Sequence, residues 1–133
     1  MDFSIADILY FSEYVFTDTG ETARHFALVL LSSKIVCIDH NVLCAVITSQ
    51  KSRYLSLKLI KEKYNCFNKD SYICFDRRDI NPIALLHKDR QQPVGHLDAE
   101  DIKKSFKILK IILYGSADKY LVATIVREWK QIK

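Results

Sequence analysis

The sequence predicts a mainly β or α+β fold, in which a small antiparallel sheet or partly open barrel is followed by one or two helices. Several short apolar segments separated by polar turns predict the strands. Apolar residues at helical spacing after residue 97 predict the helices. Strands and helices do not alternate along the chain, so a parallel sheet is not expected. With 133 residues and 49% hydrophobic content, the chain has the size of a single domain that needs no disulfide to fold.

Two apolar runs organise the rest of the sequence. Residues 24–31 and 42–50 are separated by the polar turn 39–41, and neither run shows the polar alternation of a half-exposed strand. We therefore expect both to be central strands that are buried on both faces. Hairpin pairing of these strands would bring Arg24, at the start of the first, to the same rim of the sheet as Thr48, near the end of the second.

The other strands are expected in short segments around this pair. Residues 5–11 predict a first strand, which residues 14–16 can continue, and the polar segment 17–22 predicts an exposed loop. Further along the chain we expect strands at 54–59 and 71–76, a loop or short helical turn at 61–70 around Tyr64 and Phe67, and either a strand or a helix at 83–86.

Two helices are expected towards the C-terminus. Asp98 can cap the first turn of one helix, and Gly115 can end it. A second helix is expected from residue 117 to the end of the chain, with Ser116 as its cap. We interpret the apolar stripe of the second helix as core packing, with a dimer or partner contact as the second interpretation. The two stripes consist of Ile102, Phe106, Leu109 and Leu113 in the first helix, and of Leu121, Val122, Ile125, Val126, Trp129 and Ile132 in the second.

The net charge of +4 is small, but the positive residues gather in one part of the chain. Such a cluster either attracts polyanions or is an ordinary solvated face. The cluster comprises Lys51, Arg53, Lys58, Lys61, Lys63, Lys69, Arg77, Arg78, Lys88 and Arg90.

Several classes of protein are not indicated. No apolar run approaches the roughly 18 residues of a membrane span, and Asp2 and Asp7 do not suit the basic start of a signal peptide, so we expect a cytosolic protein. Cys37, His40 and Cys44 could suggest a metal site, but Cys44 lies inside an apolar run and no second pair of ligands follows. We therefore expect no metal or other cofactor, reduced cysteines, and buried small hydrophobic residues at positions 37 and 44.

Six motifs in the chain resemble, in order, the landmarks of the PemK/MazF toxin family. The family pattern is roughly Gly-Asp-Ile, Phe-Pro-Phe-Thr-Asp, Arg-Pro-x-Leu-Val-Leu, Ile-Thr-Ser, a Ser-x-Ile strand and a Gly-x-Leu helix start. The matching segments are 6–9 (ADIL), 14–18 (YVFTD), 24–30 (RHFALVL), 45–49 (AVITS), 70–71 (DS) and 95–97 (GHL).

The resemblance covers about residues 5–114 and leaves 116–133 as a C-terminal helical extension of the same single domain. It implies an SH3-like barrel with a terminal helix, usually a homodimer, and the toxin of a type II toxin-antitoxin system. Such a toxin is a metal-independent endoribonuclease, a member of the hydrolase class, that cleaves single-stranded RNA, including mRNA, by attack of the ribose 2′-hydroxyl on the phosphate. It is held inactive by a cognate antitoxin protein.

The resemblance also implies roles for three residues. Arg24 would be the cationic clamp on the phosphate, or else a surface arginine paired with Glu21. Thr48 would bind the phosphate through its hydroxyl, or else hydrogen-bond the local backbone. Asp76 would be the general base, or else a surface aspartate paired with a neighbouring arginine. The residues expected to bind RNA around them are Thr17, Asp18, His25, Ser49, Gln50, Lys51, Arg53 and Arg77.

Three positions depart from the family pattern. Ala6 replaces the glycine, His25 replaces the proline after the arginine, and Cys74 stands where certain members have an arginine. An imidazole can exchange a proton near neutral pH, but adjacent strand residues point to opposite faces, so His25 and Arg24 are not both expected in one cleft. These departures keep open two other interpretations: a module that binds RNA or an antitoxin without cleaving RNA, and a purely structural interaction domain.

Overall fold

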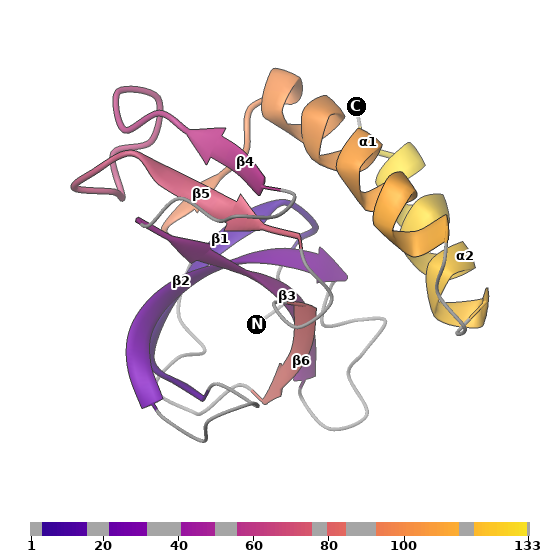
Figure 1. Cartoon of the computed structure of the whole chain (residues 1–133), viewed down its shortest axis with the longest axis horizontal. Coiled ribbons are helices and arrows are strands. Elements are labelled where there is room, and N and C mark those ends of the chain that lie inside the picture. Colours follow the sequence, from indigo (N-terminus) through magenta and orange to yellow (C-terminus); the bar gives the residue numbers. More distant parts are fainter. Residues whose placement is uncertain are drawn as a thin grey trace.

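The computed structural model describes residues 4–15, 22–31, 41–49, 56–75, 80–84, 93–114 and 119–132. These residues form a curved antiparallel sheet with two helices beside each other on one side of it (Figure 1). The predicted class, a small mainly β or α+β fold with an antiparallel half-barrel and C-terminal helices, is confirmed. The strands are β1 (Asp7–Val15), β2 (Thr22–Leu31), β3 (Asn41–Thr48), β4 (Ser56–Leu59), β5 (Ser71–Cys74), β6 (Ile80–Ala84) and β7 (Gly95–His96).

The central position of β2 and β3 is confirmed. The strands are ordered β4-β5-β3-β2-β1-β7, and β6 also pairs with β3. One edge of β3 pairs with β2, while its other edge is shared between β6, along residues 41–45, and β5, at Ile47 and Thr48. The end of β3 therefore lies between β2 and β5.

Both faces of the two central strands are buried, as their uninterrupted apolar sequence predicts. On one face, Leu28, Leu30, Ala45 and Ile47 belong to the large core that includes residues of both helices. On the other face, Ala27, Val29, Cys44 and Val46 pack with Leu9 and Phe11 of β1 in a second, smaller cluster. The sheet is thus the wall between two apolar layers.

The first strand begins two residues later than expected and is longer. A turn closed by the Asp7 amide, which donates to the Ser4 carbonyl over 3.1 Å, precedes β1. The expected continuation at residues 14–16 is confirmed as far as Val15, with a register shift between Phe11 and Tyr14. At the turn, Ala6 has a φ of 72°. Its amide donates to the Val29 carbonyl over 2.9 Å, so this backbone is tied directly to β2.

The middle of the chain follows the predicted order of elements. Residues 60–67 form consecutive turns, in which the amides of Lys63, Tyr64 and Phe67 donate to carbonyls three residues back. The strand interpretation of the apolar segment near residue 83 is correct for its described part, because β6 pairs with β3 from Ala84 to Ile80.

The first predicted helix is α1 (Ala99–Tyr114). Its cap is confirmed, because the Asp98 carboxylate accepts a 2.8 Å hydrogen bond from the Asp101 amide. The buried line of α1 is rotated from the expected stripe: Asp101, Ser105 and Leu109 are fully buried, whereas Ile102 and Phe106 are only half-buried. Asp101 can occupy this inner line because Tyr64 and Lys63 bind its carboxylate.

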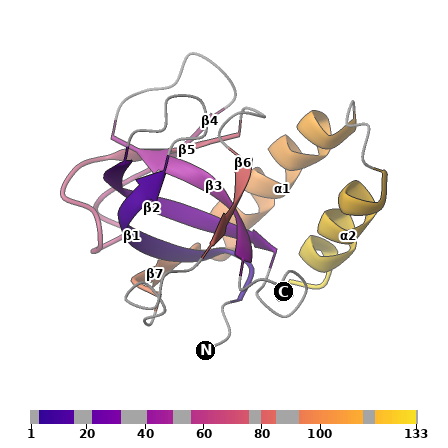
Figure 2. The same ribbon diagram turned by 90° about the horizontal axis from the view of Figure 1, so that it is seen from below.

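The second predicted helix is α2 (Lys119–Lys130), which lies next to α1 in both views (Figure 2). Core packing of its apolar stripe is confirmed for the described side chains. Ile125 and Trp129 are buried in the large core, and Val122, Val126 and Ile132 pack partly buried against it. The indole Nε1 of Trp129 donates to the Leu30 carbonyl over 2.9 Å. Among the described residues, no helix combines the length and apolar content needed to cross a membrane.

Candidate functional site

The start of β2 lies beside the end of β3. The two strands run antiparallel, and the register pairs Phe26 with Ile47. Arg24 lies two residues before Phe26 in β2, and Thr48 and Ser49 follow Ile47 directly. The backbone at Arg24 and that at Thr48 therefore lie at the same end of the strand pair.

An open pocket of about 290 Å³ lies at this end. β2 and β3 contribute one wall, and the segment that leads from the turns into β5 contributes the other. The pocket combines aromatic rings, hydroxyls, an amide and an ammonium group. Its described lining residues are Phe26, Ile47, Thr48, Ser49, Phe67, Asn68, Lys69 and Ser71.

Aromatic contacts hold the Phe26 ring in the pocket wall. The ring of Phe67 meets it edge-on, with 5.0 Å between the centroids and an interplanar angle of 86°. The ring of Tyr10 also lies against it, tilted by 60° with 5.2 Å between the centroids. Phe67 is buried, whereas Phe26 is only half-buried and keeps part of its surface accessible. Such tilted pairs are favourable aromatic geometries, so the Phe26 ring is ordered before any ligand arrives.

The loop that carries Phe67, Asn68 and Lys69 is closed at its base. The Asp70 carboxylate accepts a 3.0 Å hydrogen bond from the Lys61 amide and lies 3.5 Å from the Lys58 ammonium. The Lys61 amide, followed by the charge of Lys58, holds the pKa of Asp70 below its usual value. The Ser71 hydroxyl donates to the Lys69 carbonyl over 3.1 Å. The loop is therefore a compact unit.

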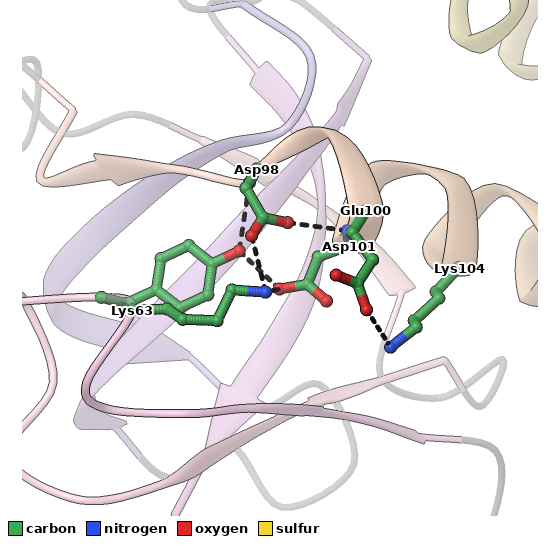
Figure 3. Close-up of polar contacts among 6 residues, drawn as sticks. Lys63, Asp98, Glu100, Asp101 and Lys104 are labelled. Carbon is green, nitrogen blue, oxygen red and sulfur yellow. Dashed lines mark hydrogen bonds and ion pairs between the residues drawn. The ribbon is translucent and has the colours of Figure 1, made fainter.

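A cluster of polar side chains fixes the same loop to the start of α1 (Figure 3). We call Lys63, Tyr64, Asp98 and Asp101 the Tyr64 clamp. The Tyr64 hydroxyl donates to the buried Asp101 carboxylate over 2.6 Å and accepts a 3.1 Å hydrogen bond from the Asp98 amide. The Lys63 ammonium lies 2.6 Å from Asp98 and 3.3 Å from Asp101.

The clamp shifts the protonation of its members in ways that favour the observed contacts. Burial, and then the hydrogen bond to Asp101, raise the pKa of the Tyr64 phenol well above its ordinary value. The hydrogen bond to Asp98 raises the pKa of Lys63. The contact with Lys63 and the Asp101 amide lower the pKa of Asp98. At neutral pH the clamp therefore holds a neutral phenol donor and a charged lysine–aspartate pair.

The lysines of the predicted basic cluster differ in how they are paired. Lys58 and Lys63 have carboxylate partners within the protein. Lys69 is exposed at the pocket and forms no ion pair with any described residue. Among the described residues of the cluster, Lys69 is the one that lines the pocket.

Two of the residues expected at the site, Thr48 and Ser49, line the pocket. Arg24 and His25 belong to β2 through their backbone, and their side chains lie outside the described part of the structure. The other expected site residues lie outside the described residues altogether: Thr17, Asp18, Gln50, Lys51, Arg53, Asp76 and Arg77.

Most of the pocket's other residues were not among those expected at the site. Phe26 was part of an apolar run, where an aromatic residue is unremarkable. Phe67, Asn68 and Lys69 lay in a polar segment, although an aromatic, an amide and a cation in succession next to a strand are a usable signal for a binding loop.

The sequence also predicted buried cysteines and no metal site. Cys44 is wholly buried as a small hydrophobic residue, as expected, and burial raises the pKa of its thiol. No group of three metal-ligating side chains occurs in the described part of the chain. Cys37 and His40 lie outside it. His96 lies in β7, where its Nδ1 is 2.8 Å from the Asp7 carboxylate, a contact that links β7 to β1.

Two of the departures from the family pattern acquire a structural context. The φ of 72° at Ala6 lies in the region that glycine adopts most easily, so alanine keeps a backbone that suits the family's glycine. Cys74 is 5% exposed and therefore offers no proton donor to solvent. No family model matches the chain, and a search of curated proteins finds no match, so the resemblance to the PemK/MazF family stays a prediction.

Proposed function

We propose that the protein is a metal-independent endoribonuclease of the PemK/MazF toxin type that cleaves single-stranded RNA. One observation carries the proposal: Thr48 and Ser49, at the end of β3, line an open pocket with an aromatic ring and Lys69, next to the end of the strand that bears Arg24. Hydroxyl, aromatic and cationic groups at a rigid strand end are the groups that bind phosphate and unpaired bases.

The proposed reaction uses the RNA's own nucleophile. The ribose 2′-hydroxyl loses its proton to a base and attacks the adjacent phosphorus, and the bond from phosphorus to the 5′-oxygen breaks. The 5′-oxygen takes a proton and leaves as a hydroxyl, while the other fragment ends in a 2′,3′-cyclic phosphate. Negative charge gathers on the phosphate oxygens during the attack, so a fixed cationic clamp accelerates the step.

In this proposal Arg24 is the cationic group that binds the phosphate, because its planar guanidinium can donate two parallel hydrogen bonds to it. The Thr48 hydroxyl binds the same phosphate, and Asp76 is the base. The remaining residues named for RNA binding in the sequence analysis contact the strand on either side. The proposal further includes a cytoplasmic location, a homodimer and inhibition by a cognate antitoxin.

The test is cleavage of RNA by the purified full-length protein in the presence of EDTA. Fragments with 2′,3′-cyclic phosphate ends support the proposal, and their absence at every protein concentration contradicts it. Arg24→Ala should lower the cleavage rate roughly a hundredfold, as the loss of one transition-state donor does. Arg127→Ala is the matched control. Arg127 is exposed on α2, so its substitution removes the same charge at a position on that helix.

A non-catalytic module that binds RNA or an antitoxin is the second candidate. The observation that favours it is the chemistry of the pocket, whose described lining residues include no carboxylate and no imidazole to act as a base. Binding of RNA that weakens steeply with salt, without any cleavage, would select this candidate. Binding that does not respond to salt would count against a polyanion ligand for either candidate.

A further inference from the structure

We propose that the pocket between β3 and the 67–71 segment binds one unpaired nucleobase, which stacks on Phe26 and is read by Asn68, while Lys69 binds the flanking phosphate. The inference deepens the proposed function and rests on it for the choice of nucleic acid as ligand. It assigns base recognition to Phe26 and Asn68 and a phosphate contact to Lys69, all of which lie outside the proposed catalytic set of Arg24, Thr48 and Asp76.

The size of the pocket suits a single nucleotide. Its volume of about 290 Å³ lies at the lower end of the range of small-molecule pockets, which is roughly 300 to 1,000 Å³. The pocket is open to solvent on one side, so a base can enter while its sugar and phosphate stay in the strand. A base inside an RNA duplex could not enter, because its edges and faces are occupied.

Phe26 supplies the stacking surface. Its ring lines the pocket, is half-buried and contacts the rings of Phe67 and Tyr10, with 5.0 and 5.2 Å between centroids. A ring that is already ordered loses little side-chain entropy when a base stacks on it. Stacking on an aromatic side chain tolerates any base, so Phe26 provides affinity rather than selectivity.

Asn68 supplies the selectivity. Its side chain is exposed at the pocket and makes no hydrogen bond to any described residue. A carboxamide presents a donor next to an acceptor, which complements a base edge that offers an acceptor next to a donor. Two such hydrogen bonds discriminate between bases, because a mismatched edge leaves a donor facing a donor. The Ser49 hydroxyl, which is exposed in the same lining, can adapt as donor or acceptor.

Lys69 follows Asn68 directly and supplies charge where the backbone of the bound strand would pass. It has no ion pair with a described residue, so no existing contact has to break before it binds a phosphate. Its neighbour Asp70 does not compete with the phosphate for this charge, because the Lys61 amide and Lys58 already hold the carboxylate. The loop therefore presents an unpaired cation beside an acid that is already paired.

The contacts of the loop keep this arrangement in place. Tyr64 anchors the loop to α1 through Asp101, and the Ser71 hydroxyl fixes the carbonyl of Lys69. A preformed pocket avoids the cost of ordering a loop on binding. This rigidity makes the loop a better reader of a base than a free chain would be.

The experiment uses five DNA pentamers, in which a variable central nucleotide (A, C, G, T or an abasic site) is flanked by two abasic nucleotides on each side. DNA lacks the 2′-hydroxyl, so binding is measured without cleavage. Fluorescence anisotropy at several salt concentrations gives the dissociation constants for the full-length protein. We expect the abasic pentamer to bind several-fold more weakly than the preferred one, because it cannot stack.

The variants separate the three roles. Phe26→Leu should weaken binding of every base-containing pentamer about tenfold, within the range of one stacking contact. Asn68→Ala should leave the binding but reduce the preference among the four bases. Asn68→Asp should shift the preference towards guanine, whose N1 and N2 are adjacent donors for a carboxylate. Lys69→Ala should weaken all pentamers alike and reduce the salt slope by about one.

Two residues of the same loop serve as matched controls. Asn65 and Lys61 are exposed but do not line the pocket, so Asn65→Ala and Lys61→Ala should keep the wild-type base preference. Because Asn68 and Lys69 are exposed, their variants are expected to fold even if Phe26→Leu does not.

Each outcome decides the inference separately from the proposed function. Wild-type base preference in Asn68→Ala and Asn68→Asp would overturn the inference, even if RNA is cleaved under the control of Arg24. Loss of base preference in these variants would support it, even if the protein never cleaves RNA. Absence of binding to all five pentamers would overturn it as well, whatever RNA cleavage shows.

Discussion

Ala6 shows how one residue keeps a backbone that its side chain does not favour. Its φ of 72° lies in the left-handed region, where a residue with a Cβ costs roughly 1–2 kcal/mol relative to the usual conformation. The residue is tied on both sides, because its amide donates to the Val29 carbonyl and its carbonyl accepts from the Leu97 amide over 3.0 Å. The surrounding strands therefore impose the conformation.

Substitutions at Ala6 should separate strain from packing. Ala6→Gly relieves the strain but removes a buried methyl group and adds freedom to the unfolded chain, so the free energy of unfolding should change by less than about 1 kcal/mol. Ala6→Val adds a branched side chain at positive φ in a site with 0% exposure, and should cost about 3 kcal/mol. Urea denaturation of both variants measures the difference. Equal stability of the two variants would mean that neither the strain nor the packing at Ala6 matters.

At the scale of elements, the loop between β4 and β5 connects the helices to the pocket. Its buried residues Tyr64 and Phe67 make different contacts: Tyr64 binds the start of α1, and Phe67 packs against Phe26. The Tyr64 clamp therefore fixes the pocket wall without lining the pocket.

Tyr64→Phe tests the clamp through the pH dependence of stability. At neutral pH the variant should lose about 2 kcal/mol, because the buried Asp101 carboxylate loses a hydrogen-bond donor. The pKa of Tyr64 is raised in the folded state, so its contribution is complete below the unfolded value of about 10 and is lost as the pH rises further. The gap between wild type and variant should therefore narrow above about pH 10.

Denaturation curves from neutral pH to about pH 11 give this gap directly. Lys63 has a raised pKa too, so both proteins should lose stability in alkali, but the wild type should lose more. Asp98, whose pKa is lowered, acts at the other end: its contribution is lost below about pH 4 in both proteins. Tyr10→Phe removes an exposed hydroxyl and is the control. A gap that stays constant up to about pH 11 would contradict the assigned role of Tyr64.

At the scale of the whole molecule, the C-terminal helix completes the core that β2 and α1 begin. Trp129 is 2% exposed, stacks on Phe106 of α1 at 6.5 Å and donates to the Leu30 carbonyl of β2. One side chain thus joins both helices to the central strand. The helix α2 lies beyond the part of the chain that resembles the toxin family, and its residues Ile125 and Trp129 are packed into the same hydrophobic core.

Substitution of Trp129 should therefore affect global stability. Trp129→Ala should cost about 3–5 kcal/mol through the cavity that it leaves. Trp129→Phe should cost about 2 kcal/mol, because the buried Leu30 carbonyl loses its donor. Ile111→Ala, on an α1 position with 64% exposure, is the control and should be nearly neutral. Unchanged stability together with a change of oligomeric state in Trp129→Ala would instead make Trp129 an interface residue.

Local sequence patterns were enough to predict several elements of the fold. Uninterrupted apolar runs predicted that β2 and β3 are central, and Asp98 before an apolar stripe predicted the start of α1. The sequence also directed attention to the end of β3, where Thr48 and Ser49 line the pocket. These features follow from period and capping, which depend on neighbours along the chain.

The set of residues that share the pocket could not be predicted from the sequence, because it depends on the tertiary structure. Phe26, Thr48 and Asn68 are far apart in sequence, and they meet because β3 pairs with β2 on one edge and with β5 on the other. The sequence also did not predict that Asp101 lies on the buried side of α1. A buried aspartate is stable only with the partners that Tyr64 and Lys63 provide. Strand pairing and buried polar contacts join residues that are far apart in the sequence, so a pattern among neighbouring residues does not predict them.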